Sequence, residues 1–94
     1  MSNSSDTQSS TMKKYRKPSI VHRKLGREGA WGQYDFNTQT IQLDPRTPPL
    51  MAMDTLVHEA LHHLLPDMAE GTVEVTATRL AHILWGQNYR KVSQ

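Results

Sequence analysis

Apolar residues in the second half of the chain recur at steps of three and four positions, which is the spacing of an amphipathic helix. One helix is predicted over Leu50 to Leu65 and a second over about Glu70 to Gln87. Thr47 and the two prolines after it are a plausible start for the first helix, and Pro66 ends it. The apolar positions are Leu50, Met53, Val57, Ala60, Leu61 and Leu64 in the first helix, and Val73, Ala77, Leu80, Ala81 and Leu84 in the second.

Shorter runs upstream alternate between apolar and polar residues, which indicates β-strands. Strands are predicted over Ser19 to Leu25, Ala30 to Asp35 and Thr40 to Asp44. The segment "FNTQ" joins the second and third strands, so these two form a hairpin. The predicted fold is therefore a minimal α+β domain, with a sheet of about three strands packed on the first helix and on the second, C-terminal helix.

Composition narrows the class of protein. The chain has 94 residues and no cysteine, so we expect one small domain without a disulfide, an iron–sulfur cluster or a zinc finger. Such a domain buries a small core and usually needs a metal or a partner for stability. No apolar run is long enough to cross a membrane, and the N-terminus lacks the apolar stretch of a signal peptide. We therefore expect a cytoplasmic protein without membrane contact.

Charge is distributed unevenly along the chain. Residues 1–18 are polar and indicate a disordered tail, which leaves a single domain over residues 19–94. Seven of the 11 lysine and arginine residues lie between Lys13 and Arg27. We interpret this basic arm as a solubilising tail in preference to a nucleic-acid contact. Tyr15 is its only aromatic residue, and base stacking needs aromatic side chains.

Three of the five histidines lie close together in "HEALHH", and two of these share one face of the first predicted helix. His58 and His62 are four residues apart, about 6 Å along the helix axis, so both imidazoles can reach one metal ion. Glu59 is rotated by about 100° from His58, where its carboxylate can accept a proton from metal-bound water. This H-E-x-x-H pattern is typical of zinc metallopeptidases. We therefore predict a zinc site in preference to a polar pair on a solvated face.

The third ligand must come from outside this motif. A catalytic zinc usually has three protein ligands and one open position, and the second helix offers Glu70 and Glu74. We favour Glu74, because small residues follow it on the same helical face and would let the two helices come close. Glu70 is interpreted as a favourable charge at the positive end of the helix dipole. Asp67 and His82 are the remaining candidates.

The segments "TLVHEALHHLLP" and "VEVTATRLAHILW" resemble the gluzincin metallopeptidases. Among these, they are similar to the minigluzincins and to the small phage- and prophage-associated peptidases of the ImmA/IrrE type. The resemblance covers about Ala30 to Trp85 and includes a "G-x-Y-D" hairpin that begins at Gly32. It implies a zincin-like fold in which two histidines and a later glutamate bind zinc, while the glutamate inside the motif is the general base. The chain departs from the ImmA/IrrE pattern at Thr78, where asparagine is frequent. Matched by motif, the ligands are His58, His62 and Glu74, and the base is Glu59.

The resemblance also implies an activity, the hydrolysis of peptide bonds in a peptide or protein substrate. Zinc would polarise the scissile carbonyl and acidify the bound water that acts as nucleophile, and Glu59 would carry the proton of this water to the leaving amine. The hairpin before the helix would hold the substrate in extended form. Gly32 suits close approach of another backbone, with a β-bulge as the alternative. The expected substrate-binding residues are Trp31, Gly32, Gln33 and Tyr34.

Other polar residues near the motif have less specific interpretations. We expect His63 to be exposed, because it points about 100° away from His62. Asp54 precedes His58 by one turn, so it either orients that imidazole or is solvated. Tyr34 and Tyr89 are candidates for stabilising an oxyanion, and the sequence selects neither.

A second class of function stays open. The chain could be a catalytically silent, zinc-stabilised module that binds a partner through the hairpin edge or the basic arm. The presence of Glu59 favours an enzyme, because a structural zinc site needs no general base. The small size favours the module, because little chain remains to form the walls of a substrate cleft.

Overall fold

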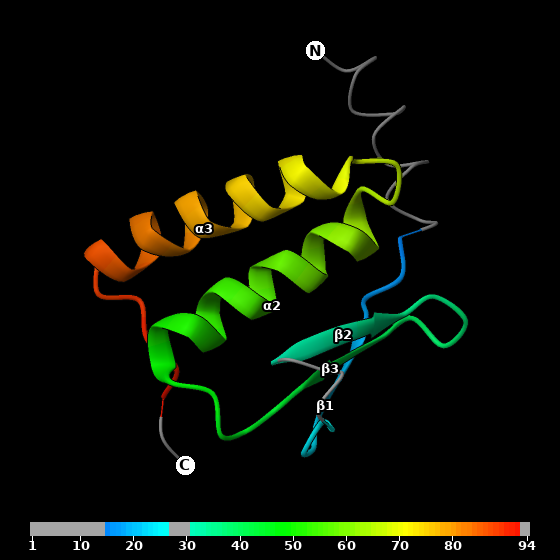
Figure 1. Ribbon diagram of the computed structural model, residues 1–94, viewed down its shortest axis with the longest axis horizontal. Helices are drawn as coiled ribbons and strands as arrows, with labels where there is room; N and C mark the ends of the chain where they lie inside the picture. Colours follow the sequence, from blue (N-terminus) through cyan, green and yellow to red (C-terminus); the bar gives the residue numbers. More distant parts are fainter. Residues whose placement is uncertain (1–14, 27–30, 93–94) are drawn as a thin grey trace, which may run out of the picture.

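The computed structural model describes residues 15–26 and 31–92. The predicted tail up to residue 14, and Ala30 at the start of the second predicted strand, lie outside the described residues. The described chain forms three strands and two helices, which confirms the predicted α+β class (Figure 1). The elements, in chain order, are β1 (Ser19–His22), β2 (Gly32–Asp35), β3 (Thr40–Leu43), α2 (Pro49–Leu64) and α3 (Glu70–Gly86).

The sheet is mixed, and its central strand is the last of the three in the sequence. The strand order is β1-β3-β2, with β1 parallel and β2 antiparallel to β3. In this register Ile41 of β3 pairs with Ile20 on one side and with Tyr34 on the other. Side chains that pair in this way share one face of a sheet. Ile41 is only 1% exposed, so this face of the central strand belongs to the core.

Helix α2 lies between the sheet and α3. It packs on β2 and β3 with one side and on α3 with the other, and α3 packs mainly on α2 (Figure 1). Val73, Ala77 and Ala81 recur at steps of four residues along α3 and are fully buried, so their small side chains allow the two helices to approach closely. The H-E-x-x-H segment therefore lies on α2, which packs against the sheet on one side and against α3 on the other.

The loop that leads into α2 is built around the buried carboxylate of Asp44. One carboxylate oxygen accepts hydrogen bonds from the backbone N–H and the Nε–H of Arg46 at 2.9 and 2.8 Å. The other oxygen accepts from the backbone N–H of Leu25 at 3.1 Å and forms an ion pair with the same guanidinium. The hydrogen bond and charge of Arg46 hold the pKa of Asp44 well below its usual range,. Asp44 thus ties the segment after β1 to the start of α2.

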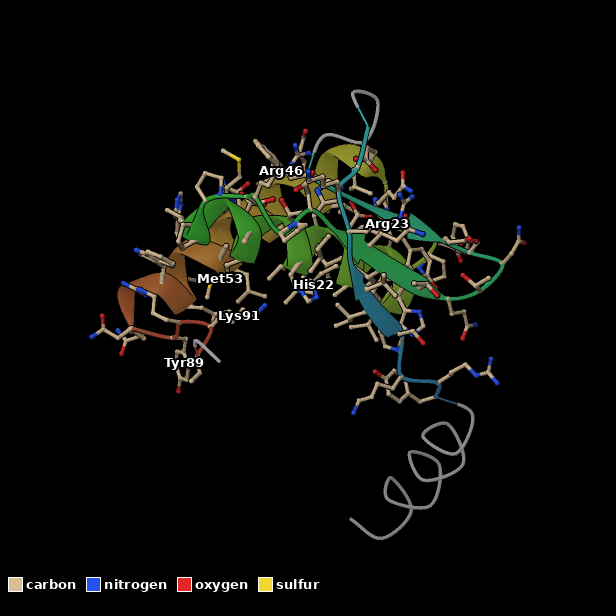
Figure 2. All side chains as sticks on the ribbon, turned by 90° about the horizontal axis from the view of Figure 1, so that it is seen from below. His22, Arg23, Arg46, Met53, Tyr89 and Lys91 are labelled. Carbon is tan, nitrogen blue, oxygen red and sulfur yellow. The ribbon has the colours of Figure 1, made fainter. Side chains whose placement is uncertain are left out.

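Helix α3 ends in a left-handed residue that turns the chain back. Asn88 has a φ of 69°, its N–H donates to the carbonyl of Trp85, and the N–H of Tyr89 donates to the carbonyl of Leu84. These two bonds are those of a Schellman motif. The C-terminal segment then returns toward the sheet, where Lys91 Nζ lies 3.5 Å from Nε2 of His22 (Figure 2). Neither described helix has the length and apolarity that a membrane crossing requires.

Candidate metal centre

Two histidines of α2 and one glutamate of α3 converge in the structure. Nε2 of His58 lies 3.1 Å from Oε2 of Glu70, and Nε2 of His62 lies 3.1 Å from Oε1 of the same carboxylate. The two imidazole rings are 5.0 Å apart between centroids. One nitrogen or oxygen atom from each of the three residues lies within 4.8 Å of the others, so this group could hold a metal ion.

The antiparallel packing of the two helices explains why these residues meet. On α2, Asp54, His58 and His62 form a row at steps of four residues,. A matching row on α3 starts at Glu70 and contains Glu74 and Thr78. His62 contacts Glu70 at one end of the paired rows, and Asp54 accepts a hydrogen bond of 2.9 Å from the hydroxyl of Thr78 at the other end. These two contacts are eight residues apart on each helix, about 12 Å along the axis.

The third residue of the group is not the one favoured by the sequence. Glu74 lies one turn after Glu70 on α3 and does not belong to the group. His58 contacts Glu70 instead, and the side chain of Glu74 is exposed. Asp67 and His82, the other candidates, are also exposed and do not belong to the group. The assignment of Glu74 as a ligand stays a prediction, while the geometry favours Glu70.

The cluster is open to solvent on the side of Glu70 and closed on the side of α2. The side chains of His58 and His62 are 19% and 25% exposed, whereas that of Glu70 is 65% exposed. Glu59, the predicted base, is buried within α2. Burial raises the pKa of Glu59, and the neighbouring charges of His58 and His62 offset part of this effect,. The Glu59 carboxyl group therefore ionises less readily than an exposed glutamate would.

Asp54 does not orient His58 in the described structure. Its half-buried carboxylate accepts the hydrogen bond from Thr78, so its partner lies on the other helix. Neither of the two expectations for Asp54, a contact with His58 or full solvation, describes this arrangement. No sequence pattern indicated the bond, because it depends on the register between the two helices.

His63 is more constrained than its position in the sequence suggested. It is half-buried, its Nδ1 lies 2.6 Å from the hydroxyl of Tyr34, and its Nε2 lies 2.6 Å from the carbonyl oxygen of Arg16. The Tyr34 hydroxyl is therefore engaged by His63 rather than directed freely into the cluster. Burial, together with the negative charge of Asp35, raises the pKa of Tyr34. Tyr89, the other oxyanion candidate, is 63% exposed on the C-terminal segment.

The predicted substrate strand is an edge strand of the described sheet. β2 pairs only with β3 among the described strands, and it packs against α2. Trp31 precedes it and is partly exposed, and the exposed Gln33 donates from Nε2 to Oε1 of Gln42 at 2.7 Å. The register of β2 and β3 runs without interruption, so Gly32 does not mark a bulge. Substrate binding by Trp31, Gly32, Gln33 and Tyr34 stays a prediction.

Gly32 has a packing role that the sequence did not reveal. A Cβ atom at this position would lie 2.5 Å from Cγ2 of Thr55 on α2 and 3.1 Å from the carbonyl oxygen of Gln42. Real Cβ atoms essentially never approach another atom as closely as 2.5 Å, and the contact at 3.1 Å would also be tight. The glycine therefore brings the start of β2 against α2, which fixes the distance between the edge strand and the helix that carries the histidines.

Comparisons with protein families, curated proteins and solved structures found no match to the chain.

Proposed function

We propose that the protein is a zinc-dependent metallopeptidase of the gluzincin kind, in which His58, His62 and Glu70 bind the metal and Glu59 is the general base. The observation that carries the proposal is the convergence of both Nε2 atoms on one carboxylate from another helix, beside a buried glutamate. Two imidazole nitrogens and a carboxylate oxygen are a ligand set of catalytic zinc sites and leave a fourth position open.

The distances support a shared ion. Ligands placed 2.0–2.1 Å from a tetrahedral zinc lie about 3.3 Å from one another. Each of the two nitrogen-to-oxygen separations is 3.1 Å, to a different oxygen of the Glu70 carboxylate, and one ligand atom of each residue lies within 4.8 Å of the others, so the three residues are close enough to share one ion. The same distances also suit hydrogen bonds between histidine and glutamate. The choice between these two interpretations therefore depends on a metal-binding measurement.

Each residue has a separate role in the proposed reaction. Zinc, when bound, supplies Lewis acidity that activates a water molecule and polarises the scissile carbonyl. Glu59 accepts a proton from the attacking water and returns it to the leaving amine. Burial raises the pKa of Glu59, and a carboxylate with a raised pKa is a stronger base toward the attacking water than an exposed carboxylate would be.

The substrate in this proposal is an extended peptide that lies along β2. An edge strand offers unpaired backbone N–H and C=O groups, which can hydrogen-bond to an added strand. Gly32 brings the start of this edge close to α2, so a peptide on the edge would lie near the helix that carries the ligands. The exposed side chain of Gln33 would lie close to such a peptide.

A second candidate function is a zinc-stabilised binding module without catalysis. The small size of the core favours it, because Leu25, Ile41, Val73, Ala77 and Ala81 are the buried hydrophobic residues of the described chain. A metal that joins α2 to α3 would add stability to a core of this size.

The deciding experiment combines metal analysis with a peptide-library cleavage assay of the full chain and of Glu59→Gln. If the protein is a metallopeptidase, we expect both proteins to bind zinc with similar affinity and only the natural chain to cleave peptides. Equal cleavage by both proteins rules out Glu59 as the base. Tight zinc binding without cleavage of any peptide selects the binding module, and absence of zinc binding excludes both functions.

A further inference from the structure

The hydrogen bond between Thr78 and Asp54 belongs to the same pair of helix rows as the metal-binding group. Thr78 Oγ1 donates to Oδ2 of Asp54 at 2.9 Å, and both side chains are half-buried between α2 and α3. A bond to an ionised acceptor is stronger than one between neutral groups, and partial burial protects it from water. This bond therefore joins the two helices about 12 Å from the contact of His62 with Glu70.

Such a bond fixes the register between α2 and α3. A shift of α3 by one residue along its axis is about 1.5 Å, which is enough to break a hydrogen bond of normal length. The metal-binding group has the same sensitivity, because two of its members lie on α2 and the third lies on α3. Metal sites tolerate errors of only about 0.2 Å in ligand distance. A contact that sets the register therefore also sets the approach of Glu70 to the histidines.

We propose that Asp54 and Thr78 are a positioning pair that holds the carboxylate of Glu70 against His58 and His62. Neither residue belongs to the metal-binding group, so the pair acts only through the helices that it joins. Its effect on metal affinity rests on the proposed function, whereas its effect on the contacts between the histidines and Glu70 does not require a metal.

The first test measures zinc affinity of the full chain and three variants by competition titration. Thr78→Val removes the hydroxyl and keeps the shape of the side chain. We expect it to weaken zinc binding on the order of tenfold, the lower end of the loss caused by removing groups that orient ligands. Thr78→Ser keeps the donor and restores the affinity. Thr76→Val is the matched control, because Thr76 is half-buried on the same helix and its hydroxyl bonds to no described residue. The Co²⁺ forms are compared by visible absorption, which reports ligand geometry.

The second test uses the metal-free proteins, so it stays informative if the natural chain binds no zinc. The imidazole nitrogen resonances of His58 and His62 are compared between the natural chain and Thr78→Val. His63 is the reference, because its ring bonds to Tyr34 and Arg16 and not to α3. We expect the resonances of His58 and His62 to shift while those of His63 stay unchanged. If Thr78→Val does not fold, Asp54→Asn takes its place, because the amide oxygen still accepts the bond without the charge; we then expect smaller shifts at the same two histidines.

The outcomes separate the two proposals. Unchanged resonances of His58 and His62 overturn the positioning pair, whether or not zinc binds. Equal zinc affinity and an equal Co²⁺ spectrum in the natural chain and in Thr78→Val also overturn it, and these results leave the metallopeptidase proposal intact. If the natural chain binds no zinc and the resonances of His58 and His62 still differ in Thr78→Val, the positioning pair is supported and the metallopeptidase is excluded.

Discussion

The Tyr34 hydroxyl lies 2.6 Å from Nδ1 of His63, the residue that follows the candidate ligand His62. The other ring nitrogen, Nε2, lies 2.6 Å from the carbonyl oxygen of Arg16. A carbonyl oxygen can only accept, so Nε2 carries the proton, and in the neutral ring Nδ1 accepts from the hydroxyl of Tyr34. Two adjacent histidines therefore face different sides of α2: His62 turns to α3, and His63 turns to Tyr34 of the sheet and to Arg16.

This difference predicts separate effects of the two alanine substitutions. His62→Ala removes one of three ligands, so we expect zinc affinity to fall by more than about 100-fold. His63→Ala removes two hydrogen bonds, so we expect a loss of about 1–3 kcal/mol in the free energy of unfolding, with zinc affinity almost unchanged. Zinc titration and urea unfolding of both variants check this. Equal losses of metal would show that the ligand assignment is wrong.

The two glutamates of α3 are predicted to differ in their effect on zinc. Glu70→Gln replaces the carboxylate that contacts both histidines, so we expect affinity to fall by more than about tenfold. Glu74→Gln changes an exposed side chain one turn later, and we expect less than a twofold change. The measurement is zinc titration of both variants beside Glu59→Gln. A larger loss for Glu74→Gln would restore the ligand that the motif resemblance implies.

Removal of the metal is predicted to lower the melting temperature. A ligand present at 100 times its dissociation constant stabilises the folded state by about 2.7 kcal/mol. In a domain of this size, each kcal/mol corresponds to about 4–8 °C, so we expect a decrease on the order of 10 °C or more after chelation. Calorimetry with and without chelator checks this. The His62→Ala variant is the control, because its zinc affinity is expected to be lower by more than about 100-fold, so it has little bound metal to lose. A decrease of equal size in that variant would indicate a direct effect of the chelator.

Substitution of Gly32 is predicted to destabilise the fold. The added methyl group of Gly32→Ala meets Thr55 of α2 at 2.5 Å and the backbone of Gln42 at 3.1 Å. We expect the free energy of unfolding to fall by about 1–3 kcal/mol, as in other overpacked sites. Gly86→Ala is the matched control, because nothing lies within 4 Å of a Cβ atom there. Urea unfolding measures both, and an equally small effect of the two would contradict the packing role of Gly32.

The acid stability of the fold is predicted to depend on Asp44. Its folded-state pKa is lowered by Arg46, so the folded state favours the ionised carboxylate. The resulting stabilisation is complete above the ordinary pKa near about 4 and declines as the pH falls below that value toward the folded-state pKa. We expect Asp44→Asn to be less stable at pH 7 and to lose less of its remaining stability between about pH 4 and 2. Thermal unfolding across this range checks it, and parallel curves for the two proteins would contradict it.

Local sequence patterns predicted the elements of the fold well, because the patterns depend on neighbouring residues. The first helix was expected over Leu50 to Leu65 and is observed over Pro49–Leu64. The first strand is shorter than expected and ends at His22. Leu25 leaves the strand and is buried, and its N–H bonds to Asp44. The parallel pairing of β1 with β3 was not predicted, because it joins segments that are distant in the sequence.

The candidate site was predicted only as far as local sequence patterns define it. His58, Glu59 and His62 are defined by helical periodicity alone. Glu70 and Glu74 are four residues apart and share a face, so periodicity cannot distinguish them. Only the register of α3 on α2 determines which carboxylate meets the imidazoles. This register depends on contacts between the two helices, such as the buried row that begins at Val73 and the bond between Asp54 and Thr78.

The three candidate ligands lie within 13 consecutive residues, from His58 to Glu70. The site therefore belongs to a helical hairpin whose contacts are local, whereas the sheet requires β1 to pair with β3 across a longer stretch of chain that includes β2. Local contacts form faster than distant ones. We therefore expect the hairpin to assemble before the sheet, and a metal bound at this stage would favour folding by stabilising the helical hairpin on which the strands then pack.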